Sequence, residues 1–213
     1  MSDSFETIRA RIIADPDNQT YTERGIAPLY RATAQARLCV VGQAPGRVAE
    51  QTKLYWNDLS GDRLRTWMGL TREQFYHDPR IAVLPMDFYY PGRGQSGDLP
   101  PRKGFANKWH PLLIEQMPQL ALYLLVGSYA YRYYLGLTGK ESAAQVIQNG
   151  VTYWGHGLDT TDSPEPKQQQ RHKFFPIVHP SPRNNIWLHK NPWFEIDIVP
   201  NLRWHVARVL GMH

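Results

Sequence analysis

Short apolar runs alternate along this chain with segments whose apolar residues recur at helical spacing. The runs are rich in Val, Ile, Leu and Phe, and each stops at a glycine, proline or histidine, as buried strands do. They lie at residues 37–41, 81–84, 120–126 and 174–178. Helical patterns cover residues 5–14, 60–70, 111–117, 129–137 and 200–210. The alternation predicts an α/β fold of three layers, α/β/α, with a central four-stranded parallel sheet.

Local signals add detail to this prediction. Thr71 and Gln74 have the spacing of a capping box that begins a short helix. Ser128 follows the third run and is expected to cap the next helix. Residues 91–104 are rich in Gly, Pro, Arg and Lys and predict a long exposed loop, whereas the polar residues 151–172 predict a hairpin or loop.

Composition narrows the class of protein. The 213 residues, with 42% hydrophobic and 20% charged side chains, suit a single globular domain over residues 1–213. A net charge of +5 favours an anionic partner such as nucleic acid. The N-terminus lacks the pattern of a signal peptide, and no apolar run reaches the length of a membrane span. We expect a soluble, cytoplasmic monomer that needs no metal or cofactor.

Two loops stand out because each begins where a predicted strand ends. Residues 42–46 contain two glycines and a proline, which permit a tight, stiff turn close to a ligand. Residues 179–185 begin with a histidine, followed by two prolines that flank a serine. In a parallel sheet both loops would meet at the carboxyl-end rim, where ligands bind. A plain strand-to-helix turn and a structural histidine remain the alternatives.

These loops resemble the two signature motifs of the uracil-DNA glycosylase superfamily. The matching sequences are Gly42-Gln43-Ala44-Pro45-Gly46 and His179-Pro180-Ser181-Pro182. Weaker matches lie at residues 60–64, 125–130 and 175–179. The resemblance covers about residues 37–185. It implies hydrolysis of the N-glycosidic bond of a base that has been flipped out of DNA.

The resemblance assigns the chemistry to particular residues. Cleavage leaves positive charge on the sugar and negative charge on the departing base, so donors are needed at the base carbonyl. His179 would be one donor, and the backbone amides from Gly42 to Ala44 would be others. Gln43 takes the position that contacts the base. The base would also touch Pro45.

Aromatic and basic side chains complete the implied site. Tyr55 and Trp56 lie where relatives carry a stacking aromatic residue, with core packing as the alternative. Ser181 can bind a phosphate oxygen, and Arg183, Asn184 and Asn185 occupy the region that fills the space left by the flipped base. Contacts with the DNA backbone are further expected of Gly46, Arg47, Arg93, Arg102, Lys103 and Lys190.

Three departures from the family pattern limit the assignment. Ala44 stands where the best-known members have a water-positioning aspartate, so Asp58 or Asp62 is a candidate for that role. The alanine-bearing branch usually holds a four-cysteine iron–sulfur cluster, and this chain, with Cys39 as its one cysteine, falls in a branch without the cluster. Asp87 takes the place of a base-reading asparagine, which leaves the target base open.

The sequence thus predicts a monofunctional DNA glycosylase of base excision repair that removes uracil or another deaminated base and leaves an abasic site. We see no lysine placed for lyase chemistry. A catalytically weak or inactive nucleic-acid-binding module on the same fold is the alternative, and a nucleoside hydrolase is a third interpretation.

Overall fold

The computed structural model describes residues 4–95, 97–149, 154–155 and 172–212. Its central sheet has the strand order β2-β1-β5-β7-β6. The first four strands run parallel, which confirms the predicted parallel sheet, and the short edge strand β6 adds an antiparallel fifth. The bounds are β1 (Leu38–Val41), β2 (Ile81–Val83), β5 (Leu122–Val126), β6 (Trp154–Gly155) and β7 (His172–Ile177). Most of the predicted hairpin over residues 151–172 lies outside the described residues.

Strands β1 and β5 lie inside the sheet, and every one of their side chains is buried. Cys39 pairs with Ala82 of β2 and with Tyr123 of β5. Cys39 and Val41 pack into one core cluster, whereas Leu38 and Val40 pack into the other. Because both faces are covered, these strands appear in the sequence as continuous apolar runs rather than alternating ones.

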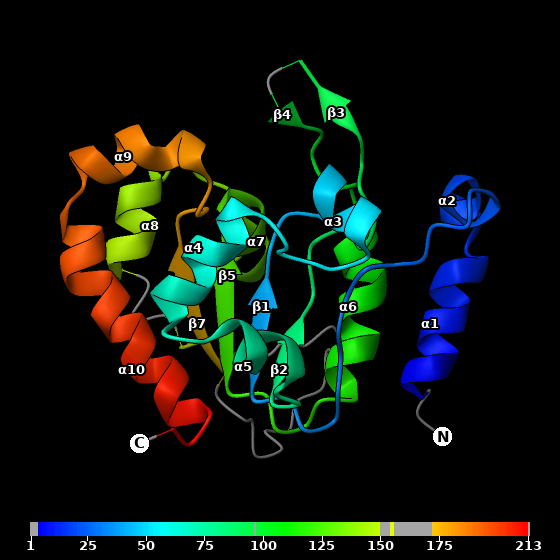
Figure 1. The fold of residues 1–213 in the computed structure, drawn as a ribbon, viewed down its shortest axis with the longest axis horizontal. Coiled ribbons are helices and arrows are strands. Elements are labelled where there is room, and N and C mark those ends of the chain that lie inside the picture. The colour runs from blue at the N-terminus through cyan, green and yellow to red at the C-terminus, as the bar shows by residue number, and fades with distance from the viewer. Residues whose placement is uncertain (1–3, 96, 150–153, 156–171, 213) are drawn as a thin grey trace.

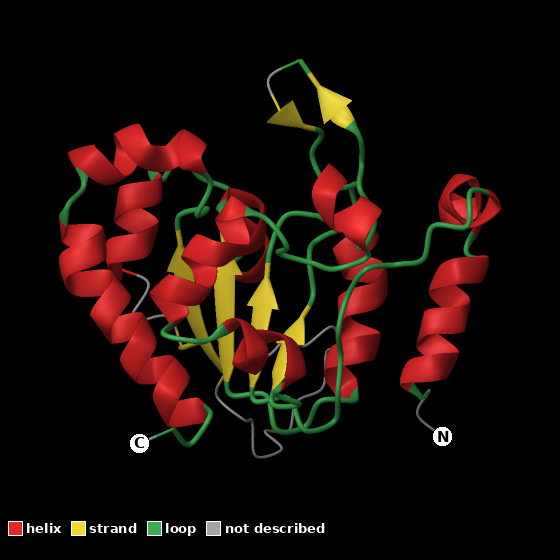
Figure 2. Ribbon diagram, in the orientation of Figure 1, coloured by secondary structure: helices red, strands yellow, loops and turns green. Residues whose placement is uncertain are grey.

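Helices cover both faces of the sheet, as Figure 2 shows, so the three-layer prediction is confirmed. The Cys39 face packs against α1 (Phe5–Ala14), α6 (Phe105–Glu115) and α7 (Ser128–Tyr134). The opposite face packs against α4 (Leu59–Met68), α5 (Arg72–His77) and α10 (Val199–Val209). Within the described residues, the other α-helices are α2 (Gln19–Glu23), α3 (Arg47–Thr52), α8 (Ala143–Asn149) and α9 (Asn185–Lys190).

The structure confirms some of the predicted helix boundaries and caps and contradicts others. The helix over residues 5–14 and the capping box of Thr71 and Gln74 are confirmed. The prediction that Ser128 caps α7 is wrong, because Gly127 takes the cap position with φ 84° and Ser128 is the first helical residue. Helix α6 begins at Phe105, before the predicted start at Pro111, because Gly104 reverses the chain with φ 79°.

The segment 91–104, predicted as an exposed loop, contains a small hairpin. Strands β3 (Arg93–Gly94) and β4 (Gly97–Asp98) pair antiparallel in a sheet of their own. Figure 1 shows this hairpin standing above the ends toward which β1 and β5 point. The hairpin therefore extends the carboxyl-end rim, although it lies outside the central sheet. Among the helices that the structure describes, none is long and apolar enough to cross a membrane.

Candidate active site

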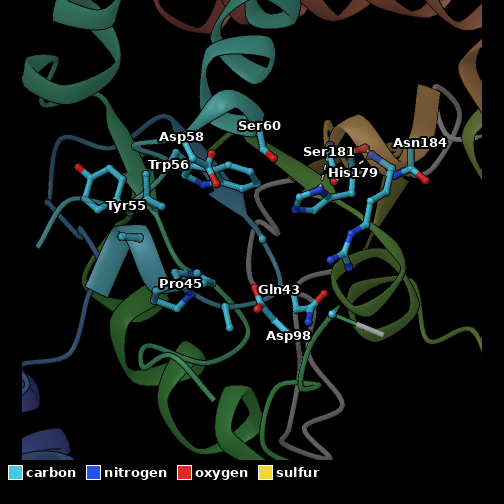
Figure 3. A pocket seen from close by; sticks show the side chains of 18 residues that line it. Gln43, Pro45, Tyr55, Trp56, Asp58, Ser60, Asp98, His179, Ser181 and Asn184 are labelled. Carbon is cyan, nitrogen blue, oxygen red and sulfur yellow. Dashed lines mark hydrogen bonds between the residues drawn. The ribbon is translucent and has the colours of Figure 1, made fainter. Parts of the chain in front are cut away.

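A cavity of about 460 Å³ opens at the carboxyl-end rim of the sheet. The loop after β1, residues 42–46, forms one part of its wall, and His179, Ser181, Arg183 and Asn184 from the loop after β7 form another. The predicted meeting of the two loops is therefore present in the structure. Further walls come from the segment before α4 and from the hairpin, with Tyr55, Trp56, Asp58, Ser60, Gly97 and Asp98 (Figure 3).

The imidazole of His179 points into this cavity (Figure 3). The backbone N–H of Ser181 donates to its Nδ1 at 3.2 Å. Nδ1 must then carry the lone pair, so the neutral ring bears its proton on Nε2. Burial lowers the pKa of His179 below its usual value, and the negative charges of Asp58 and Asp98 oppose this shift only in part. Near neutral pH the ring is therefore a neutral donor.

The backbone around His179 is fixed from two sides. The side-chain amide of Asn184 donates to the carbonyl oxygen of His179 at 2.7 Å. At the end of β5, Gly127 has φ 84°, and a Cβ built there would lie 3.4 Å from the Cβ of His179. Glycine is favoured at this position because a side chain would be strained at this φ, and the space beside it is filled by the histidine. The ring orientation thus depends on two neighbouring strand ends.

Trp56 forms the cavity wall beside His179, with the two ring centroids 5.5 Å apart and a tilt of 31°. Its φ of 54° is left-handed, which is uncommon for a residue with a side chain. The carbonyl oxygen of Trp56 accepts hydrogen bonds from Tyr76 Oη and from Arg65 Nη1, each at 3.0 Å. A Cβ on Gly42 would lie 2.8 Å from the indole, so glycine permits this close packing.

Tyr55 also lines the cavity, but its ring packs against aromatic side chains of α5. Its ring centroid lies 6.2 Å from that of Phe75 and 5.7 Å from that of Tyr76. Burial raises the pKa of Tyr55. Of the two aromatic residues selected from the sequence, Trp56 is therefore better placed against a bound base.

Two carbonyl groups of the loop after β1 are hydrogen-bonded within the protein. Gly42 and Gln43 accept hydrogen bonds from the amides of Met86 and Asp87, at 2.8 and 3.2 Å. Among the described residues, no acceptor takes the backbone N–H of Gln43 or Ala44. The side-chain Nε2 of Gln43 donates to the carbonyl of Leu99 at 3.1 Å. Gln43 thus lines the cavity and also connects the loop to the hairpin.

The structure does not support Asp87 as a base-reading residue. Asp87 is fully buried and is not among the described residues that line the cavity. Its carboxylate accepts from Arg102 Nε at 2.7 Å, from Arg102 Nη2 at 2.8 Å and from the amide of Tyr89 at 3.1 Å. A buried carboxylate needs such partners. Arg102, selected as a phosphate contact, is thereby an internal partner of Asp87.

Two carboxylates line the cavity within the described part of the chain, Asp58 and Asp98. Asp58 was anticipated from the sequence, and its Oδ1 caps α4 by accepting from the amide of Gly61 at 2.8 Å. Asp62 lies outside this cavity and pairs with Arg65. Asp98 was missed, because residues 91–104 carried no signal beyond that of a charged loop. It comes from β4 and accepts from Tyr90 Oη at 3.2 Å.

The residues chosen for DNA contact divide between the cavity and its surroundings. Ser181 and Arg183 line the cavity, and Ser181 Oγ accepts from the amide of Arg183 at 3.3 Å. Asn185 lies outside it and binds Arg63 through Oδ1 at 2.8 Å. Of the other predicted phosphate contacts, the exposed ones are Arg47, Arg93, Lys103 and Lys190, which do not line the cavity.

Cys39 lies in the middle of β1 and is fully buried, which raises the pKa of its thiol. With one cysteine in the chain, the residues present do not fit a four-cysteine iron–sulfur cluster. No group of three or more His, Cys, Asp or Glu side chains within the described residues is arranged to hold a metal ion.

A parallel sheet with a rim cavity and a neutral histidine donor defines a ligand-binding α/β domain. A family model of the uracil DNA glycosylase superfamily matches residues 29–203 of this chain. The protein therefore belongs to the uracil DNA glycosylase superfamily, as the two loops indicated. The matched segment contains every described residue that lines the cavity.

Proposed function

We propose that this protein is a monofunctional DNA glycosylase of base excision repair. It hydrolyses the N-glycosidic bond of a flipped-out uracil or other deaminated base and leaves an abasic site. Superfamily membership supports glycosylase chemistry on DNA. The observation that carries the proposal is the neutral imidazole of His179, which keeps its Nε2–H for the cavity while Nδ1 is bound by Ser181.

The donors around the cavity match the charge that develops during cleavage. As the bond to C1′ breaks, negative charge moves to a carbonyl oxygen of the base. His179 Nε2–H and the backbone amides of Gln43 and Ala44 supply donors for that oxygen. One such donor contributes about 2.7–4 kcal/mol to transition-state stabilisation in other enzymes. A neutral ring suits this arrangement because Nδ1 can accept from Ser181 while Nε2 keeps its proton as the donor.

The cavity also suits the shape and chemistry of a deaminated base. Uracil, hypoxanthine and xanthine each carry a ring carbonyl beside an N–H group. The carbonyl matches the histidine donor, and the N–H group matches an acceptor such as Asp58. Trp56 offers a face for stacking, worth about 1–3 kcal/mol per base. None of the cavity residues that the structure describes is a lysine, which supports hydrolysis without a Schiff-base lyase step.

The exposed cations support DNA as the partner. Arg47 lies at the start of α3 beside the first loop, and Arg93 lies on the hairpin. Arg183 lines the cavity mouth. Together with the net charge of +5, these side chains favour a polyanion whose backbone passes over the rim. Binding is then expected to weaken as the salt concentration rises.

One assay tests the function directly. Labelled oligonucleotides that carry uracil, hypoxanthine or xanthine, single-stranded and double-stranded, are incubated with the protein and then treated with alkali, which breaks the strand at abasic sites. We expect strand breaks with at least one base, and their loss in His179→Ala. Tight, salt-sensitive binding without base release from any substrate would instead support the non-catalytic module.

A further inference from the structure

The loop after β1 provides no acidic side chain, since residues 42–46 are Gly, Gln, Ala, Pro and Gly. Hydrolysis nevertheless needs a group that takes a proton from the attacking water. We infer that Asp98, on β4 of the hairpin, is this group, and that Tyr90 and Gln43 are positioning residues that hold it. The inference rests on the proposed function and names a residue that sequence reasoning did not find.

The position of Asp98 fits the role. Its Oδ2 lies 3.7 Å from the point where a Cβ on Gly46 would stand, so the carboxylate lies over the loop that lacks an acid of its own. Figure 3 shows Asp98 and Gln43 on the side of the cavity opposite Asp58 and Trp56. A base packed against Trp56 then has its glycosidic bond between the indole and Asp98. A water on Asp98 approaches C1′ from the face away from the base.

Contacts on both sides of Asp98 hold it there. Tyr90 Oη donates to its Oδ1 at 3.2 Å. The next residue, Leu99, accepts from Gln43 Nε2 at 3.1 Å and donates its amide to the carbonyl of Gly92 at 2.9 Å. The hairpin, in which Asp98 pairs with Arg93, is thus attached to the first loop. Oδ2 faces that loop, while Oδ1 is oriented by the tyrosine.

Asp58 is the rival carboxylate, and its surroundings argue for a different role. Its Oδ1 accepts from the amide of Gly61 at 2.8 Å and caps α4. A cap of this kind stabilises a helix by about 1 kcal/mol. Asp58 also lies on the side of Trp56, where the base packs, rather than across from it (Figure 3). Asp58 therefore suits base contact and helix capping, and Asp98 suits the water.

The water oxygen forms a bond to C1′ while the C1′–N bond breaks, and the electron pair of that bond leaves with the base. One proton of the water passes to the Asp98 carboxylate. The anionic base, held by His179, takes up a proton from solvent as it departs, and Asp98 returns its proton to solvent. The products are a sugar hydroxyl and a neutral base.

The test compares three variants by single-turnover base release and by the dissociation constant for DNA. The variants are Asp98→Ala, Asp58→Ala and the control Glu115→Gln, which alters an exposed acid at the opposite rim, where α6 ends. We expect Asp98→Ala to slow release by about 10²–10⁴-fold without weakening DNA binding. Added formate, which supplies a free carboxylate, should restore part of its rate and leave the control unchanged.

Each outcome decides a separate point. Release by Asp98→Ala within about threefold of the unaltered protein overturns the inference and leaves the proposed function standing. The inference also fails if formate restores Asp58→Ala and has no effect on Asp98→Ala. Asp98→Asn provides a second variant with nearly unchanged shape, and it should be as slow as Asp98→Ala. Absence of release by the unaltered protein from every substrate overturns the proposed function and the inference together.

Discussion

His110 and His179 are both imidazoles that their surroundings keep neutral, but His110 is fully buried in the core and His179 is only partly buried at the rim. In the core, both ring nitrogens of His110 are hydrogen-bonded, Nδ1 to Tyr134 Oη at 2.7 Å and Nε2 to the carbonyl of Pro85 at 3.0 Å. At the rim, His179 uses Nδ1 to accept from Ser181 and directs Nε2 into the cavity. The two histidines therefore differ at Nε2, which is hydrogen-bonded within the protein in His110 and faces the cavity in His179.

Two acidic residues, Asp87 in the core and Asp98 on the hairpin, repeat this contrast. Asp87 is fully buried, and Arg102 and the amide of Tyr89 satisfy its carboxylate. Asp98 is exposed to the cavity and accepts from one tyrosine hydroxyl. A fully bonded polar group stabilises the fold, whereas a partly bonded one that faces a cavity is a candidate for chemistry.

The strongest test of the contrast removes the rim nitrogen. His179→Phe keeps a ring of similar size but loses the donor, so we expect single-turnover base release to fall by about 10²–10³-fold. The free energy of unfolding should fall by less than in a variant of His110, because Nε2 of His179 has no partner within the described part of the protein and only the part-buried amide of Ser181 loses its acceptor, Nδ1. Chemical denaturation measured beside the rate checks both statements. An unchanged rate would remove His179 from the mechanism.

The corresponding substitution in the core replaces His110. His110→Phe leaves Tyr134 Oη and the carbonyl of Pro85 without their partner. Each buried group left unpaired costs about 1–3 kcal/mol, so we expect the free energy of unfolding to fall by about 2–4 kcal/mol. Base release by the protein that remains folded should stay within a few-fold of the original rate. Urea denaturation and an active-fraction titration measure the two effects.

Lowering the pH should decrease the free energy of unfolding, because the core histidine stays neutral in the folded protein. Burial lowers the pKa of His110 to about 4, against 6.5 for the exposed residue. Between these values the unfolded chain binds more protons, so the stability that His110 contributes is complete above about pH 6.5 and is lost as the pH falls toward 4. One proton accounts for a slope of at most about 1.4 kcal/mol per pH unit.

The slope can be measured from urea denaturation between about pH 4.5 and pH 7. His110→Phe should show a shallower slope than the unaltered protein. His179 and His205, whose pKa values burial also lowers, continue to contribute in the variant. Equal slopes in the two proteins would contradict the neutral, fully bonded state of His110.

The smallest expected effect lies between the two regions, at Gly127. Gly127→Ala places a side chain on a backbone with φ 84° and ψ 169°, in contact with His179, which costs about 1–3 kcal/mol in stability. Because the new methyl group meets the histidine, base release should also slow, by less than in His179→Phe. Denaturation and single-turnover rates measure the two losses. A loss of stability with no change in rate would show that the end of β5 does not orient the imidazole.

The sequence was informative about the sheet because burial on both faces leaves continuous apolar runs at β1 and β5. The meeting of the two loops followed from parallel strand direction alone. Asp98 could not be found this way, since β3 and β4 have two residues each and show no alternation. The burial of Asp87 depends on Arg102, fifteen positions away, and residue types at that separation give no signal of their pairing.

The left-handed backbone conformation of Trp56 also could not be predicted from the sequence. Trp is not a residue type that favours a positive φ, whereas the neighbouring Asn57 is, so the sequence would place such a turn at the asparagine. The conformation is held by Tyr76 and Arg65, which bind the carbonyl oxygen of Trp56 from α5 and α4. The pairing is tertiary, so the place of the indole beside His179 emerges only when the helices are packed.

The burial of Cys39 has a practical consequence for following the protein at work. The native thiol, enclosed in β1 with its pKa raised, should resist maleimide dyes while the protein is folded. A cysteine introduced at the exposed Gln95, near the tip of the hairpin, would then carry a fluorophore selectively. Such a reporter would record the approach of DNA to the hairpin beside the cavity in real time, with the native thiol left in place.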